Sequence, residues 1–118
     1  MANDMPELIE SIINENLFTD EMIEEYAEKI RLTKDIAGLK DTAERELTKC
    51  KEVLKNYPFR FAATEPIFQA NIWICDQLIE AYKNTDYTKI SALKFLLEEL
   101  AVRAEDAHRA LMYDILRE

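Results

Sequence analysis

The chain contains a single glycine, Gly38, and three prolines among its 118 residues. β-Hairpins depend on glycine and asparagine at their turns, because these residues tolerate the positive φ angles that tight turns need. A chain so poor in turn formers is therefore unsuited to a sheet. Hydrophobic residues make up 48% of the sequence and charged residues 33%, which suits long solvated helices around a core. We expect an all-α fold, and the length predicts one domain over residues 1–118.

Apolar residues recur at helical spacing in four segments. The pattern predicts a short helix within residues 4–18, a long helix from a cap at Thr19 to about residue 56, a third helix over 65–84 and a last one from about residue 88 to the C-terminus. The apolar stripe of the long segment changes face near Gly38, where we expect one bent helix rather than two helices. Short connections imply antiparallel neighbours. The expected architecture is an antiparallel bundle of three long helices plus a short N-terminal helix.

The stripes also predict which side chains form the core. In the long segment the expected core positions after the bend are Ile36, Leu39, Ala43, Leu47, Cys50, Leu54 and Tyr57. In the last helix they are Leu93, Leu97, Leu100, Ala104, Ala107, Leu111 and Ile115. Asn71 falls within the apolar arc of the third helix, where we expect it to fix helix register, and Trp73 falls on that helix's polar side.

A second apolar ridge lies opposite the core stripe of the last helix. It is formed by Phe95, Val102 and Tyr113. Exposed apolar ridges of this kind are covered either by another part of the chain or by a partner. We expect the N-terminal helix or another subunit to cover this one, and we take the ridge and Trp73 as candidate interaction residues.

The charge balance bears on possible partners. Fifteen basic and 24 acidic residues give a net charge of −9, and the basic residues form no block of the kind that nucleic-acid binding requires. We therefore expect no nucleic acid, and an acidic surface that steers basic partners. The apolar runs are too short for a membrane span, and the acidic start does not resemble a secretory signal. With Cys50 and Cys75 in no metal-binding or redox spacing, a cytoplasmic protein with reduced thiols is expected.

The stretch "RAEDAHRAL", residues 103–111, contains the single histidine of the chain. Arg103 and His108 match the Arg-x4-His spacing of small helical ribonucleases, but residues five apart diverge by about 140° on a regular helix. Glu105 and His108 match the Glu-x-x-His element of helical di-iron sites, yet Glu105 leans away from the core stripe. A phospho-accepting role for His108 lacks a glycine or lysine nearby. We interpret His108 as a residue at the edge of the core, with Glu105 and His108 as weak metal candidates.

No arrangement of residues in the sequence indicates a catalytic site or a cofactor. The sequence therefore predicts a small interaction, regulatory or assembly module, rather than an enzyme, that packs an apolar helix face against a protein partner or a second copy. The alternative is a small helical enzyme or metal protein centred on Glu105 and His108, ribonuclease-like or di-iron-like.

Overall fold

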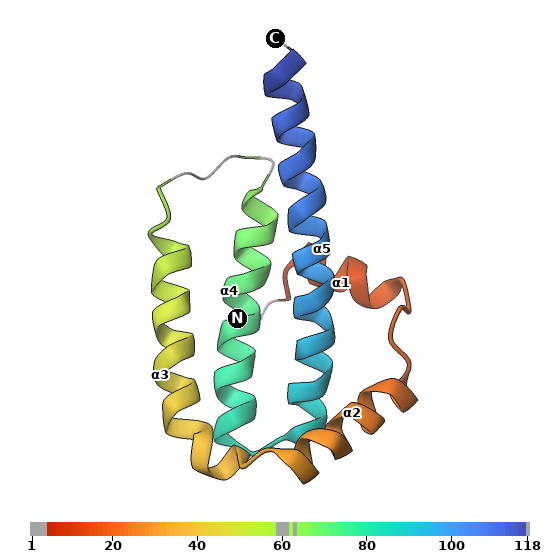
Figure 1. The fold of residues 1–118 in the computed structure, drawn as a ribbon, viewed down its shortest axis with the longest axis vertical. Helices are drawn as coiled ribbons and strands as arrows, with labels where there is room; N and C mark the ends of the chain where they lie inside the picture. Colours follow the sequence, from red (N-terminus) through yellow and green to blue (C-terminus); the bar gives the residue numbers. More distant parts are fainter. Residues whose placement is uncertain (1–4, 59–61, 63, 118) are drawn as a thin grey trace.

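A computed structural model describes residues 5–58, 62 and 64–117, with side chains as far as Asp106. Within this part of the chain there are five helices and no strands, so the all-α prediction is confirmed (Figure 1). The helices are α1 (Glu7–Asn14), α2 (Asp20–Thr33), α3 (Ile36–Lys55), α4 (Glu65–Lys83) and α5 (Tyr87–Arg117).

The expected long second helix is two helices, and the prediction of one bent helix is wrong. Lys34 leaves the helical conformation with φ −125° and ψ 138°, and Asp35 then caps α3 by accepting a hydrogen bond from the Gly38 amide at 3.0 Å. Gly38 is therefore not the hinge, since it lies in the first turn of α3. A Cβ at this position would lie 2.3 Å from Asp35 Oδ2, so the glycine leaves room for the capping carboxylate.

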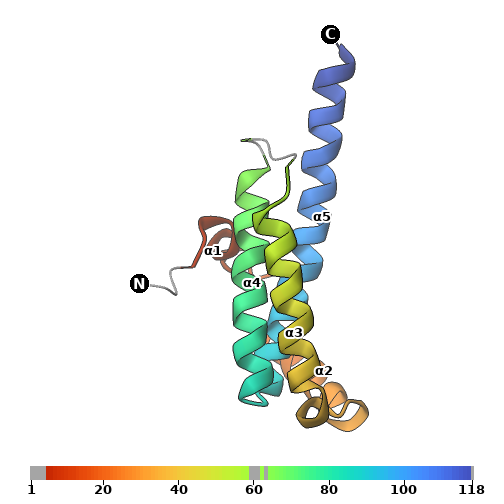
Figure 2. The ribbon, with the colours of Figure 1, turned by 90° about the vertical axis from the view of Figure 1, so that its left-hand side faces the viewer.

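Three helices run side by side in alternating directions. α4 lies between α3 and α5, while α2 crosses obliquely at the end of the bundle where α5 begins (Figure 1). α1 packs against α4 and α5, and Figure 2 shows it on the opposite side of α4 from α3 and α5. The C-terminal part of α5 projects beyond the ends of α3 and α4 in both views.

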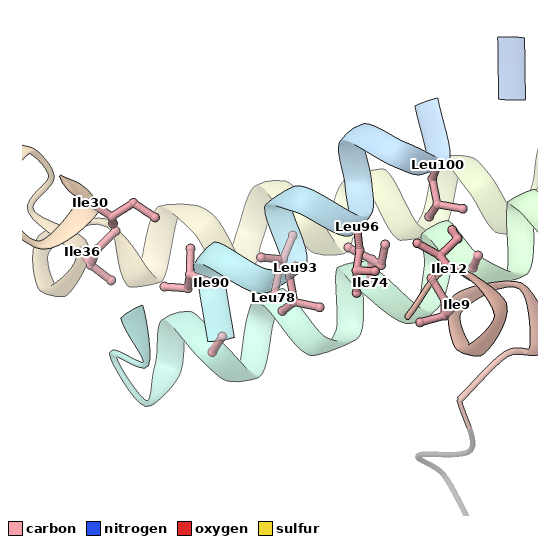
Figure 3. Packing of buried hydrophobic residues seen from close by; sticks show 12 residues of the cluster. Ile9, Ile12, Ile30, Ile36, Ile74, Leu78, Ile90, Leu93, Leu96 and Leu100 are labelled. Carbon is pink, nitrogen blue, oxygen red and sulfur yellow. The ribbon is translucent and has the colours of Figure 1, made fainter. Parts of the chain in front are cut away.

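The core is a continuous row of aliphatic side chains between these helices (Figure 3). Ile30 and Ile36 lie at one end, Leu78 and Leu93 near the middle, and Leu100 at the other end beside the isoleucines of α1. Burying one such side chain stabilises the fold by about 1.5–3 kcal/mol. The buried residues of α5 include Ile90, Leu93, Leu96 and Leu100. Leu93 and Leu100 are buried as expected, whereas Leu97 is 39% exposed and its neighbour Leu96 is buried instead. The expected core residues Ala107, Leu111 and Ile115 have side chains outside the described residues.

α2 is fastened to α5 by polar and aromatic contacts. Ser91 is fully buried and donates its hydroxyl to the Ile23 carbonyl oxygen at 2.7 Å. Phe95 packs against Tyr26, with ring centroids 5.6 Å apart in an edge-to-face arrangement. The Asp86 carboxylate accepts from the Lys89 amide at 3.1 Å and so caps the start of α5. These contacts fix the position of α5, which forms one wall of the site described next.

Candidate functional site

An open apolar groove of about 460 Å³ runs between α3 and α5, with α4 as its floor. Leu47, Cys50, Val53 and Leu54 line it from α3, Asn71, Ile74, Cys75 and Leu78 from α4, and Leu97 from α5, with Glu46 and Lys49 at the α3 rim. Val53 is 64% exposed and Leu97 is 39% exposed. The groove is therefore an apolar surface in contact with water on its open side.

The groove exists because α3 packs mainly against α4 and leaves its own apolar stripe half covered. Three residues of the expected core stripe are exposed: Leu39 and Cys50 in α3, and Tyr57 just after its end. α3 contacts α4 extensively along its length, whereas Leu97 of α5 lies across the groove from it. Small side chains explain part of this arrangement, since Ala43 and Cys50 occupy positions of the α3 stripe where a bundle packed on two sides would need larger residues.

An ion pair and a ring contact join α3 and the residues after it to α4. Lys51 Nζ lies 2.5 Å from Asp76 Oδ1, and the lysine side chain is only 22% exposed. Tyr57 and Phe68 pack ring against ring at 5.5 Å between centroids near the C-terminal end of α3. Asn71 donates its side-chain amide to the Ile67 carbonyl oxygen at 2.9 Å, within its own helix. Asn71 therefore lies at the groove with its amide hydrogen bond already satisfied.

The two cysteines line the same groove and both are free thiols. Cys75 is buried, and burial is the main cause that raises its pKa; Cys50 and Asp76 raise it further, while Lys51 opposes them. A raised pKa keeps the Cys75 thiol protonated at neutral pH, which makes it a poor nucleophile. Cys50 is exposed on the α3 side, where a reagent or a partner entering the groove would meet it.

The candidate interaction residues from the sequence lie in different environments. Phe95 is partly buried between α5 and the N-terminal elements, since it packs against Phe18 at 5.2 Å between ring centroids as well as against Tyr26. Val102 is 53% exposed. The side chain of Tyr113 lies outside the described residues. α2 and the segment before it thus cover Phe95, and the ridge is not one continuous exposed surface.

Trp73 does not lie on a solvated polar side of α4. Its side chain packs against the buried cluster, and its indole nitrogen is enclosed without a hydrogen-bond acceptor in the described part of the chain. The large aromatic surface of tryptophan explains why it is drawn against the core from a position flanked by polar residues.

The His108 side chain lies outside the described residues, so the predicted metal and ribonuclease-like pairs are described only through Arg103 and Glu105. Arg103 forms ion pairs with Glu15, in the segment after α1, and with Glu99, whose Oε1 lies 3.3 Å from Arg103 Nε. The guanidinium thus links α5 to the N-terminal segment. Glu105 is exposed. Among the side chains that the structure describes, no three His, Cys, Asp or Glu residues converge in a way that could hold a metal ion.

The groove itself was not predicted from the sequence. Leu96 and Leu97 are adjacent leucines, and helical periodicity alone did not decide which of them faces the core. One signal was present in the sequence of α3. Val53 is apolar but lies outside the predicted core stripe, which indicates an apolar face without a partner within the chain.

Comparisons of the chain with models of protein families, with curated proteins and with solved structures found no match. Among the described residues, no helix combines the length and the apolar character required to cross a membrane.

Proposed function

We propose that this protein is an interaction module that acts by packing its apolar groove against a helical surface of another polypeptide. The observation that supports this most directly is the exposure of large apolar side chains on both walls of the groove, at Val53 and Leu97. Apolar surface left in water is unfavourable by about 25 cal/mol per Å², so covering it drives association.

The shape and chemistry of the groove support a polypeptide occupant. The channel between α3 and α5, with α4 as its floor, suits the apolar stripe of an amphipathic helix. The single amide in the lining is Asn71, which is already bonded within α4, so the groove has few groups to orient a polar ligand. The rim carries charges of both signs at Glu46 and Lys49, as polar rims of protein interfaces do.

The competing function, an enzyme or metal protein centred on Glu105 and His108, gains no specific support from the described contacts. Arg103, the arginine of the ribonuclease-like spacing, is held by Glu15 and Glu99. The ion pair with Glu15 links α5 to the segment after α1.

Site-specific photo-crosslinking in the cells that make the protein tests the proposal. A photoreactive residue in place of Val53 should yield discrete protein adducts whose partner is identified by mass spectrometry. Leu32 on α2 is 72% exposed and lies outside the groove, so the same residue there serves as the matched control. The interaction proposal fails if position 53 gives no protein adduct, or gives the same adducts as position 32.

A further inference from the structure

We infer that the groove is covered by a second copy of this chain, in a two-fold dimer that joins the α3–α4–α5 faces. This inference rests on the proposed function, because it names the polypeptide that occupies the groove. The argument for a second copy comes from the distribution of charge, from the size of the face and from where the acidic segments lie.

The negative charge of the chain is not spread evenly. Residues 7–34, which include α1 and α2, contain eight acidic and three basic side chains. α3 contains four acidic and five basic residues, and α5 contains five of each. The two helices that wall the groove are thus nearly neutral, although the whole chain carries −9.

This distribution favours a copy of the same chain over a basic partner at the groove. A basic partner would be attracted to α1 and α2, whereas the groove offers it no excess negative charge. In a two-fold dimer the same surface of each copy forms the interface. The charges on that surface must therefore not repel the identical charges of the second copy. The rim meets this requirement, because Glu46 and Lys49 give its α3 side one charge of each sign. On α5, Lys94 and Glu98, one charge of each sign, are near Leu97 in the sequence.

The size of the face matches what a stable dimer buries. α3 has 20 residues, and the molecule is 30 Å across in each of its shorter directions. A helix of that length spans about 30 Å, so the outline of this side of the molecule is roughly 30 Å by 30 Å, or about 900 Å². This upper limit leaves room for the about 800 Å² per partner of a standard interface. The groove would supply its apolar centre through Val53 and Leu97, which are 64% and 39% exposed.

The position of α1 is compatible with this arrangement. α1 lies on the opposite side of α4 from α3 and α5, so docking across the groove keeps the acidic α1 helices of the two copies on the outside (Figure 2). The charges of the two α1 helices would therefore be separated by the thickness of the bundle, where salt and water screen them. α2, which holds five of the eight acidic residues of this segment, packs on α5 at the end of the bundle.

Sedimentation equilibrium of the full chain tests the inference. From low micromolar to near-millimolar concentration, the weight-average mass should rise from 13.8 kDa toward twice that value. The double variant Val53→Glu/Leu97→Glu places four charges at the interface of a dimer and should weaken association by at least about a hundredfold. Leu32→Glu is the matched control and should associate like the parent, and circular dichroism checks that each variant remains helical.

A second measurement locates the interface. The rate at which a thiol reagent modifies Cys50 should fall about tenfold or more as the parent protein is concentrated, and should stay constant for Val53→Glu/Leu97→Glu. A parent chain that remains monomeric at every concentration overturns the inference, as does equal weakening by Leu32→Glu. If the dimer is overturned but position 53 crosslinks to a different protein, the proposed interaction function is still supported. If position 53 gives no protein crosslink, both the dimer and the proposed function are contradicted.

Discussion

At the start of α3, Gly38 is required by the side chain of Asp35 and not by its own backbone conformation. Asp35 ends the interruption between α2 and α3 by accepting from the Gly38 amide, and the missing Cβ of Gly38 provides the space for that carboxylate. Gly38 does not adopt a positive φ angle, so its backbone has no need of glycine. The sequence pattern located a discontinuity here but not its cause, because periodicity reports a change of face and does not reveal a side-chain cap.

A double-mutant cycle at this cap should show strong coupling. Asp35→Ala removes the cap and should lower the free energy of unfolding by about 1 kcal/mol. Gly38→Ala displaces the carboxylate and loses the same bond, but alanine restores up to about 1 kcal/mol of helix propensity, so the single change should be nearly neutral. The double variant should then match Gly38→Ala, which gives a coupling free energy of about 1 kcal/mol in urea unfolding. Strictly additive effects would show that the two residues do not share the cap.

At the scale of elements, the contact between α2 and α5 depends on one small buried polar residue. Ser91 is completely enclosed, and its hydroxyl is bonded to the Ile23 carbonyl oxygen of α2. The same helix pair is joined at its surface by Thr88, which donates to Glu24 Oε1 at 3.2 Å, and by the ring contact of Phe95 with Tyr26. A larger residue at position 91 would hold the two helices apart.

Two substitutions at Ser91 separate the hydrogen bond from the close approach. Ser91→Ala should destabilise the protein by about 1 kcal/mol, because a buried hydrogen bond is lost while the helix backbone remains bonded. Ser91→Val should cost about 1–3 kcal/mol more, since the extra methyl groups overpack the contact. Thermal unfolding measures both, and Ser11→Ala on the exposed surface of α1 is the control, expected within about 0.5 kcal/mol of the parent. A Ser91→Val variant as stable as Ser91→Ala would mean that α2 and α5 are not closely packed here.

At the scale of the whole molecule, the sequence predicted the class of fold and the helical segments better than the way the helices face one another. The scarcity of glycine and the periodic leucines and isoleucines pointed to helices because both are local properties. Whether Leu96 or Leu97 faces the core, and whether Trp73 turns inward, depends on where a neighbouring helix lies, which no single segment encodes. The groove is a property of three helices together. It arises because α3 packs on α4 while Leu97 of α5 remains exposed.

Because α3 packs mainly against α4, it should be the long helix that opens most easily. Of its 20 residues, all within the described part of the chain, Ile36 alone is buried, whereas α4 buries five. Local opening needs less free energy where fewer apolar contacts are broken, so in dilute solution the central amides of α3 should exchange hydrogen at least about tenfold faster than those of α4.

A second copy on the groove would cover α3, and the protection of the α3 amides should then rise with concentration while that of α2 stays constant. Hydrogen exchange at low and high concentration measures both effects. Equal protection of α3 and α4 in the dilute monomer would contradict the first, and the Val53→Glu/Leu97→Glu variant, which should show no concentration dependence, is the control for the second.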